Sequence, residues 1–302
     1  GLAAYVKKPK SYQIINSMIS FDKNKLEFLG LVEKGIYLPQ YDNKNLDILD
    51  NNFSREDVAS SAQKVLEETV CGLISEIKNV TKFTNFNLCV AGGLFANVKL
   101  NQKISELNEV DKLYVFPNMG DGGLCVGAAW LASVKYTNIR PLSMKDMRLG
   151  TEIDNVEEVF KNYKKYNLTI KKQNNINKEI AFQLSKGFPV IRVSGAMEFG
   201  PRALGNRSIL CDASDPNINQ KLNQKLNRSE FMPFAPITLE DNFESFYQDY
   251  TSTKSNLPFM TSTLNVKAKM MKEAPASVHI DETARPQLID KKMYSDLYKI
   301  LI

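Results

Sequence analysis

Residues 87–97 read NLCVAGGLFAN, in which an apolar run is followed by the glycine pair Gly92 and Gly93. An apolar run of this length before a glycine turn predicts a buried strand, and the amphipathic spacing from about Leu94 to Leu107 predicts a helix after it. The same order returns at residues 112–123, where KLYVFPNMGDGG precedes a small-residue helix from Leu124 to Val134. Strand, glycine turn and helix, used twice in succession, predict an α/β fold.

The two glycine turns are candidates for binding phosphate. Each would place backbone amides at the amino end of a helix, where unpaired N–H groups and the helix dipole favour an anion. The residues concerned are Gly92 and Gly93 in the first turn and Gly120 and Gly122 in the second. Diglycine turns also serve as plain chain reversals, so both interpretations stay open.

A long amphipathic helix precedes the first strand. Apolar residues at three- and four-residue intervals predict this helix from about Arg55 to Lys78, with Ser54 as its amino-terminal cap. Its apolar face should lie on the sheet.

A polar segment marks a domain boundary. Residues 138–155 carry a proline and show no sustained period, which places the boundary near residue 146. Beyond it the pattern predicts an α/β domain with a mixed sheet. Helices are expected at residues 177–186 and 215–227, and strands at residues 189–194 and 258–264.

The strand at residues 189–194 leads into MEFGPRALGNRSIL at residues 197–210. Two glycines in this stretch let the backbone approach a ligand, and Pro201 stiffens the turn. Arg202 and Arg207 offer planar forks that match phosphate or carboxylate oxygens. The loop therefore suits an anion, although arginines also pin loops to other parts of a fold, and the residues alone leave that alternative open.

This stretch, continued by NRSEFMPFAP at residues 227–236, resembles the signature loop of the O-carbamoyltransferases that modify antibiotics, nodulation factors and bacterial sugars. The resemblance implies an actin-like (ASKHA-type) nucleotide-binding domain followed by a YrdC-like α/β domain with a mixed sheet. Residues 1–145 would form the later half of the first domain, and residues 146–302 a second domain that is incomplete at its carboxyl end. The chain is then expected to be a fragment cut at both ends.

The resemblance also implies a reaction: ATP-dependent transfer of a carbamoyl group from carbamoyl phosphate, by way of carbamoyl-adenylate, to a hydroxyl of a small molecule or sugar. The species involved are anionic and the carbamate is short-lived in water, so the site needs concentrated positive charge and exclusion of solvent. The residues that match the family's catalytic positions are Arg202, Arg207, Arg228 and His279.

Further residues of the second domain are implied in binding substrate or nucleotide. These are Glu198, Ser208, Lys225 and Arg285. The stretch PASVHIDETARPQ at residues 275–287, which includes His279, is similar to another family segment that lines the site. A histidine there could bind phosphate as imidazolium or carry a proton; a packed, hydrogen-bonded residue is the alternative.

In the first domain the resemblance adds Asn97 to the nucleotide site and assigns Asp121 to a divalent metal, Fe or Mg/Mn. A carboxylate beside phosphate-binding amides calls for a cation in any case. The family holds this metal with two further histidines, whereas the sequence has a single histidine, His279, in the other domain. The metal site would therefore lack its histidine ligands in this chain. A turn aspartate and a solvated asparagine are the alternatives.

The sequence departs from the wider family near the last arginine of the motif. Most members carry a lysine two residues before the position of Arg228, where this chain has Leu226, with Lys225 one place earlier. Lys225 would take the lysine role through a shift at the helix end. The family also tends to carry arginines where Ala196 and Met232 stand here, which indicates a subgroup.

Composition limits the class of protein to which the chain can belong. A chain of 302 residues with 43% hydrophobic residues can bury one large or two ordinary domains. The net charge of +5 comes from dispersed lysines, which disfavours a nucleic-acid partner, and no apolar run reaches the roughly 18 residues of a membrane span. The four cysteines lack CxxC spacing, so reduced thiols in a cytoplasmic protein are expected.

Two other functions stay open. A tRNA-modifying threonylcarbamoyl enzyme has relatives of both halves, but that pathway normally keeps them as separate proteins. A non-catalytic nucleotide-binding protein would explain the missing histidines, as would truncation. The sequence decides neither the acceptor nor the choice between monomer and homo-oligomer. We expect the fragment alone not to catalyse the whole transfer.

Overall fold

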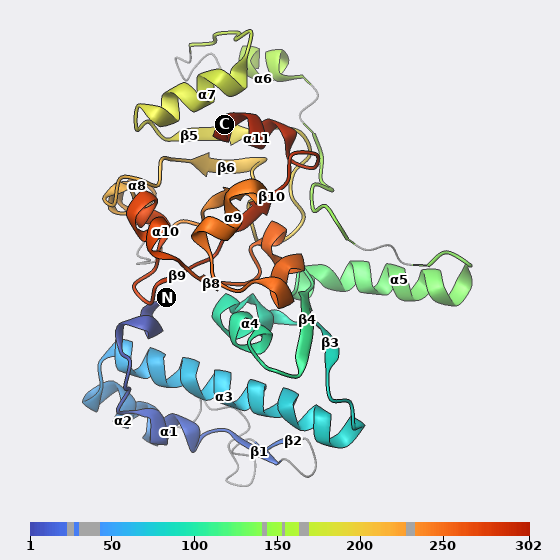
Figure 1. Ribbon diagram of the computed structural model, residues 1–302, viewed down its shortest axis with the longest axis vertical. Helices are drawn as coiled ribbons and strands as arrows, with labels where there is room; N and C mark the ends of the chain where they lie inside the picture. The colour runs from blue at the N-terminus through green and yellow to red at the C-terminus, as the bar shows by residue number, and fades with distance from the viewer. Residues whose placement is uncertain (23–26, 30–42, 141–143, 153–154, 163–168, 228–232) are drawn as a thin grey trace.

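The computed structural model describes residues 1–22, 27–29, 43–140, 144–152, 155–162, 169–227 and 233–302 (Figure 1). In the view of Figure 1, α3 (Arg55–Thr81) runs across the lower half of the molecule, the last third of the chain fills most of the middle, and α5 (Leu124–Tyr136) projects to one side. None of the helices in these ranges is long and apolar enough to cross a membrane.

The lower half is built on α3 (Arg55–Thr81). Its predicted start and cap are confirmed, because the Ser54 side chain accepts a hydrogen bond from the Asp57 amide at 3.2 Å. Short elements lie beside this helix or precede it: η1 (Leu2–Tyr5), α1 (Tyr12–Asn16), β1 (Ser20–Asp22), β2 (Glu27–Leu29) and α2 (Asn43–Asn52). They position the amino-terminal segment against α3.

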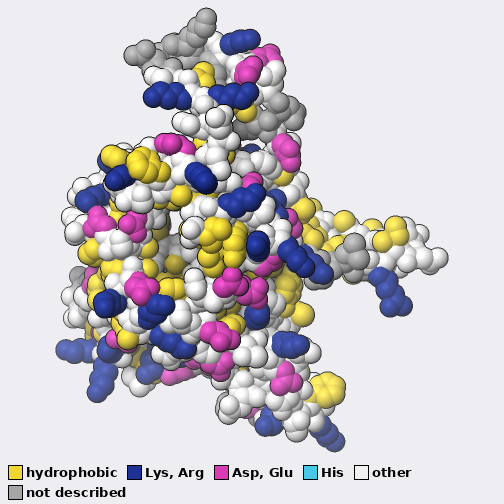
Figure 2. Space-filling model, turned by 45° about the horizontal axis from the view of Figure 1, so that its top comes forward, with side chains coloured by type: hydrophobic (Ala, Val, Ile, Leu, Met, Phe, Trp, Pro, Cys, Tyr) yellow, Lys and Arg dark blue, Asp and Glu magenta, His cyan; other side chains and the backbone are white. Residues whose placement is uncertain are grey.

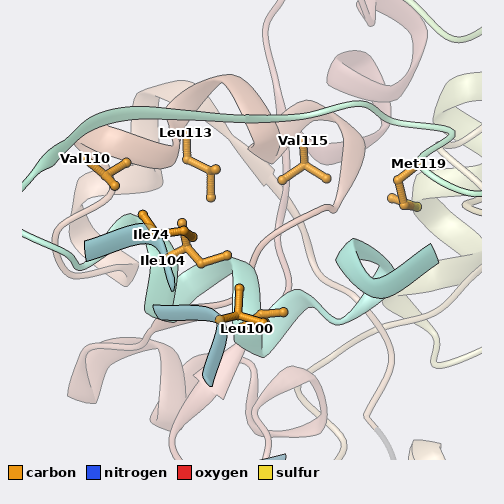
Figure 3. Packing of buried hydrophobic residues seen from close by; sticks show 8 residues of the cluster. Ile74, Leu100, Ile104, Val110, Leu113, Val115 and Met119 are labelled. Carbon is orange, nitrogen blue, oxygen red and sulfur yellow. The ribbon is translucent and has the colours of Figure 1, made fainter. Parts of the chain in front are cut away.

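The predicted strands lie side by side: β3 (Phe86–Val90) and β4 (Val110–Val115) pair in parallel. Apolar side chains of α3, α4 (Val98–Ser105) and β4 form one buried cluster, so α3 packs toward the sheet as predicted (Figure 3). Its labelled members are Ile74, Leu100, Ile104, Val110, Leu113, Val115 and Met119. Burial of one such side chain contributes about 2 kcal/mol.

The helix predicted from Leu94 starts later. Residues Gly93–Ala96 form the 3₁₀ helix η4, Asn97 is extended, and α4 begins only at Val98. The side-chain oxygen of Asn97 accepts a hydrogen bond from the Leu100 amide at 3.1 Å. An amino-terminal cap of this kind sets the first helical residue, which explains the shift.

The second predicted helix is confirmed as α5 (Leu124–Tyr136), which follows the 3₁₀ turn η5 (Asp121–Gly123). None of its residues is buried, and Leu131 and Tyr136 are each 74% exposed. Figure 2 shows this helix as an arm that carries hydrophobic side chains away from the rest of the surface.

The later part of the chain alternates helices and short strands, as an α/β fold requires. The helices are α6 (Val156–Asn162), α7 (Ile176–Ser185), α8 (Ile218–Lys225), α9 (Glu240–Phe246), η7 (Thr251–Phe259), α10 (Ala268–Glu273), η8 (Pro275–Ser277) and α11 (Ser295–Leu301). The strands are β5 (Val190–Val193), β6 (Arg207–Leu210), β7 (Ile237–Leu239), β8 (Leu264–Asn265), β9 (Thr283–Ala284) and β10 (Gln287–Ile289).

These strands form pairs, where the sequence predicted one mixed sheet. Within the described ranges, β5–β6 and β8–β9 are antiparallel pairs and β7–β10 is a parallel pair. Both orientations are present, but in small separate sheets. The α/β class is therefore confirmed, and the finer actin-like and YrdC-like folds stay predictions.

The prediction of a strand at residues 258–264 is wrong. The 3₁₀ helix η7 continues to Phe259, Met260 has a left-handed φ of 55°, and Leu264 is the only residue of that range in a strand. Pro258 lies inside η7 and lacks the N–H that a strand ladder needs.

Segments far apart in sequence lie side by side around residue 147. The Phe199 amide donates to the Met147 carbonyl at 2.6 Å, and the Gly150 amide donates to the Met197 carbonyl at 2.8 Å. η7 in turn packs on β4. The domain boundary near residue 146 stays a prediction.

Candidate functional site

Two glycine turns and the signature loop meet at the carboxyl ends of β3 and β4; we use signature loop for residues 197–210. The Gly92 amide donates to the Met119 carbonyl at 2.6 Å, which joins the two turns. Nη2 of Arg202 donates to the Ala96 carbonyl at 3.2 Å. The predicted candidates from both halves of the chain therefore share one region.

Two glycines give the signature loop its path. Gly200 has a φ of 130° and Gly205 a φ of 112°, a region that L side chains rarely adopt. A Cβ on Gly205 would lie 2.2 Å from Cδ1 of Leu297, so α11 packs directly on the loop. A Cβ on Gly200 would lie 3.5 Å from the Asn118 Cβ, beside the second glycine turn.

Glu198 shapes the loop from inside. The side chain is buried, and its Oε1 accepts hydrogen bonds from the amides of Leu204 at 2.8 Å, Asn206 at 2.7 Å and Arg207 at 3.2 Å. Charge-assisted bonds of this kind are stronger than neutral ones. The carboxylate thus organises the loop, and a direct contact of Glu198 with substrate stays a prediction.

Arg207 binds backbone carbonyls at the base of the signature loop. Its Nη1 donates to the carbonyls of Ser194 at 3.0 Å and Asn206 at 2.9 Å, and its Nη2 donates to the Gly195 carbonyl at 3.1 Å. Ser208 contributes in the same way, since its Oγ accepts from the Gly205 amide at 3.0 Å. Both side chains hold backbone in this structure, and their predicted ligand contacts stay predictions.

Arg192 is a part of the site that the sequence reasoning missed. It lies on β5, is 7% exposed, and its Nη1 donates to the Gly205 carbonyl and, at 3.1 Å, to Oδ1 of Asn206. Burial lowers its pKa, and the charges of Asp296 and Glu198 partly oppose that effect. An arginine flanked by apolar residues on a predicted strand is the signal that would have identified it.

Arg202 differs from Arg192, whose charge is opposed by Asp296 and Glu198, because no carboxylate of the described residues lies beside it. Burial lowers the pKa of this guanidinium, with no opposing acidic group. Its Nε is buried and finds no hydrogen-bond partner among the residues that the structure describes. A half-buried cation in this state favours an anion from outside.

Two cavities share a wall that includes Arg202 and Arg285. The first, of about 770 Å³, lies between α7, β6 and α8 and is also lined by Arg207, Ser208 and Asn219. The second, of about 970 Å³, lies between residues of η1, α3 and α4 on one side and residues 277–285 on the other. Both volumes lie in the range of small-molecule sites.

His279 lies in the second cavity and is held by an acid. Its Nδ1 is 2.9 Å from Oδ1 of Asp281, which also accepts from Thr283 Oγ1 at 2.7 Å, and Nζ of Lys99 lies 3.2 Å from Asp281 Oδ2. Burial alone would raise the pKa of Asp281, but the bonds from His279 and Thr283 and the Lys99 charge outweigh it and hold that pKa well below its usual range.

Asn97 and the glycine turns have partners within the protein. Asn97 caps α4 and its Nδ2 donates to Oε1 of Gln63 at 2.7 Å, at the edge of the second cavity. The Gly92 amide already donates to the Met119 carbonyl. Both Gly93 and Gly122 are exposed, and Gly120 is half-buried. Their binding of nucleotide stays a prediction.

Asp121 is exposed in η5. In the part of the chain that the structure describes, no three His, Cys, Asp or Glu side chains lie close enough together to hold a metal ion. The described residues alone do not build a complete metal site, so the binding of a metal by Asp121 stays a prediction and we derive no chemical step through a metal.

The two remaining predicted residues are Lys225 and Arg228. Lys225 is the last residue of α8, is exposed and lines neither cavity. Arg228 falls outside the described residues. The shift of the lysine role to Lys225 stays a prediction.

Family models match both parts of the chain. The model described as Carbamoyltransferase N-terminus matches residues 10–130, and the model described as Carbamoyltransferase C-terminus matches residues 181–302. The second match covers the signature loop, His279 and Arg285, and the first covers both glycine turns.

Similar proteins are known from archaea and bacteria. An uncharacterized protein of Methanocaldococcus jannaschii is 36% identical over 250 residues, which is 81% of this chain and 46% of that protein. Nodulation protein NolO of Bradyrhizobium diazoefficiens is 32% identical (78% and 43%), and nodulation protein U of Sinorhizobium fredii is 31% identical (82% and 42%). The chain spans about half the length of these relatives or less.

Proposed function

Because the chain belongs to the carbamoyltransferase family, we propose that it takes part in ATP-dependent transfer of a carbamoyl group from carbamoyl phosphate, by way of carbamoyl-adenylate, to a hydroxyl of a small molecule or sugar. In this scheme carbamoyl phosphate is first cleaved to carbamate and phosphate, and the carbamate then reacts with ATP and releases pyrophosphate.

The observation that carries this proposal is Arg202, a half-buried cation on the wall that the two cavities share, without a carboxylate partner among the residues that the structure describes. Each substrate carries phosphate, and a preorganised guanidinium in a site of low dielectric binds phosphate oxygens strongly. Arg285 lines the same wall and would add a second cation. Together they would hold the donor between the two cavities.

The other residues of the site have supporting roles in this proposal. Glu198, Arg192 and Arg207 fix the signature loop so that Arg202 is held toward the cavities. The glycine turns lie within one hydrogen bond of Arg202 through Ala96, so their amides would meet the nucleotide from the other side. A site fixed in this way pays little reorganisation cost when substrate binds.

Pyrophosphate release from ATP tests the proposal. We would measure it with and without carbamoyl phosphate, in the wild type and in an Arg202→Met variant. Release should require carbamoyl phosphate and fall by about 100-fold in the variant. Arg55→Met, which removes an exposed arginine at the start of α3 away from both cavities, is the matched control and should retain the wild-type rate. Release without carbamoyl phosphate would contradict the proposal.

A further inference from the structure

Asp281 fixes which nitrogen of His279 carries the proton. An ionised carboxylate only accepts hydrogen bonds, so Nδ1, 2.9 Å from Asp281 Oδ1, must donate. On the opposite side of the ring, Nε2 lies 3.1 Å from the nitrogen of Gly1, which is a donor. The contact with Asp281 places a ring proton on Nδ1, so Nε2 is the nitrogen that can act as a base once a water molecule takes the place of the Gly1 nitrogen.

The carboxylate is itself locked in place. Its Oδ1 also accepts from Thr283 Oγ1 at 2.7 Å, and its Oδ2 pairs with Lys99 of α4 at 3.2 Å. The strongly lowered pKa of Asp281 keeps it ionised at neutral pH. Asp281 is therefore fixed from two elements, and the imidazole ring is fixed by Asp281.

The ring stands among cations in the second cavity. The charged side chains that line this cavity besides His279 and Asp281 are Lys7, Lys64, Glu67, Lys99, Arg202 and Arg285. An anionic substrate held by Arg202 and Arg285 would share the cavity with Nε2. A basic nitrogen beside a bound acyl phosphate is suited to accept a proton from an attacking oxygen.

We propose that Asp281 is a positioning residue that orients His279, so that Nε2 accepts the proton of the water molecule that cleaves carbamoyl phosphate. In this step the water oxygen bonds to the carbamoyl carbon and one of the two water protons passes to Nε2. The bond between that carbon and the phosphate oxygen breaks, its electron pair leaves with the phosphate, and Nε2 returns its proton to the leaving phosphate. The carbamic acid so formed loses its remaining proton to solvent, and carbamate and inorganic phosphate are the products. The inference rests on the proposed function and assigns one step of it.

The chain offers a direct probe of the tautomer, because it contains a single histidine. Long-range ¹H–¹⁵N NMR of the neutral side chain distinguishes a protonated Nδ1 from a protonated Nε2. The wild type should show the proton on Nδ1. In Asp281→Asn the side-chain oxygen should turn to Lys99, which leaves the NH₂ group beside Nδ1 and moves the ring proton to Nε2. His279→Gln confirms the assignment of the signals.

Phosphate release from carbamoyl phosphate alone provides the kinetic test. His279→Gln should lower kcat by about 100-fold, and Asp281→Asn and Asp281→Ala by about tenfold or more, with little change in KM. Glu282→Gln removes the neighbouring carboxylate, which is exposed and lines neither cavity, and should retain both the tautomer and the rate. Two variants of Asp281 guard against a folding defect in either one.

Some outcomes would overturn the inference. A proton on Nε2 in the wild type, or a full rate in Asp281→Asn with the proton moved, would do so, as would absence of phosphate release by the wild type. Phosphate release with the expected tautomers, but no pyrophosphate release from ATP, would instead reject the adenylate step of the proposed function and leave the role of Asp281 intact.

Discussion

The side chain of Asn256 takes the place of a neighbouring strand beside Val115 of β4. Oδ1 of Asn256 accepts from the Val115 amide at 2.8 Å, and Nδ2 donates to the Leu113 carbonyl at 3.0 Å. Asn256 and both β4 residues are buried. One side chain of η7 therefore satisfies the edge of β4 and ties the later part of the chain to the sheet that ends at the glycine turns.

Asn256→Ala should destabilise the protein by about 3 kcal/mol, because it leaves a buried N–H and weakens the hydrogen bonding of a buried carbonyl. Urea denaturation followed by circular dichroism measures this change. Ser255→Ala is the neighbouring control: Ser255 also donates to the Leu113 carbonyl, at 3.1 Å, but leaves no unpaired amide when removed. Equal losses in the two variants would argue against the special role of Asn256.

The two arginines of the signature loop should respond differently to the same change. Arg207→Met removes four hydrogen bonds to backbone carbonyls and should cost about 2 kcal/mol of stability. Arg202→Met removes a desolvated charge with no acidic partner among the described residues, so stability should stay equal or rise.

Binding should show the opposite order. Isothermal titration with pyrophosphate should give an affinity about tenfold or more weaker in Arg202→Met than in the wild type. Arg207→Met, studied at a temperature where it is folded, should lose less. If Arg202→Met unfolds more readily than Arg207→Met and binds normally, the assignment of the two arginines is reversed.

The sequence predicted what depends on local pattern. The strands that became β3 and β4, the turns that follow them and the Ser54 cap are each encoded within a few residues, and the structure contains them. The sequence could not distinguish the role of Arg202 from that of Arg207, since both stand in one loop with similar neighbours. Only the contacts with Ala96 and with the Gly195 turn, 106 and 12 residues away, distinguish a cation left for a ligand from one that holds backbone.

The error at residues 258–264 has the same cause. An apolar, β-branched run is typical of a strand, but the edge of β4 that such a strand could join is already satisfied by Asn256. A side-chain contact over 141 residues cannot be found from a periodicity. Likewise, only folding shows that Glu198 faces inward to three amides of its own loop.

Gly205→Ala tests how closely α11 packs on the signature loop. The new Cβ would meet Cδ1 of Leu297 at 2.2 Å, in a backbone conformation with a φ of 112°. Strain and overpacking together should cost about 3 kcal/mol. Gly200→Ala has a similar φ of 130°, but its Cβ would meet only ordinary van der Waals contacts, the nearest at 3.5 Å, so it should cost only about half as much. Thermal denaturation of both variants compares them, and a larger loss in Gly200→Ala would contradict this packing.

Thiol labelling should sort the four cysteines into two pairs. Burial and the nearby Glu67 raise the pKa of Cys71 to about 11, and burial raises the pKa of Cys211. Cys89 and Cys125 are exposed. Because the thiolate is the reactive form, a disulfide reagent at pH 8 should modify Cys89 and Cys125 rapidly and the other two only after unfolding. Cys71→Ser should leave the fast phase unchanged. Four thiols that react at one rate would contradict the fold around α3 and β6.

The Asp281 carboxylate should contribute stability that depends on pH. Its pKa is lowered in the folded protein from an ordinary value of 3.8, so the folded state binds fewer protons than the unfolded state. The contribution is complete above about pH 4 and is lost as the pH falls further toward the folded pKa. Asp281→Asn should therefore be about 2 kcal/mol less stable than the wild type between pH 5 and 7, and the gap should close below pH 4. Urea denaturation from pH 2.5 to 7 measures it. The predicted difference in stability comes from the charge of Asp281, so it should depend on pH. A difference that persists unchanged to pH 2.5 would show that the substitution disturbs packing and does not act by removing the charge that orients His279.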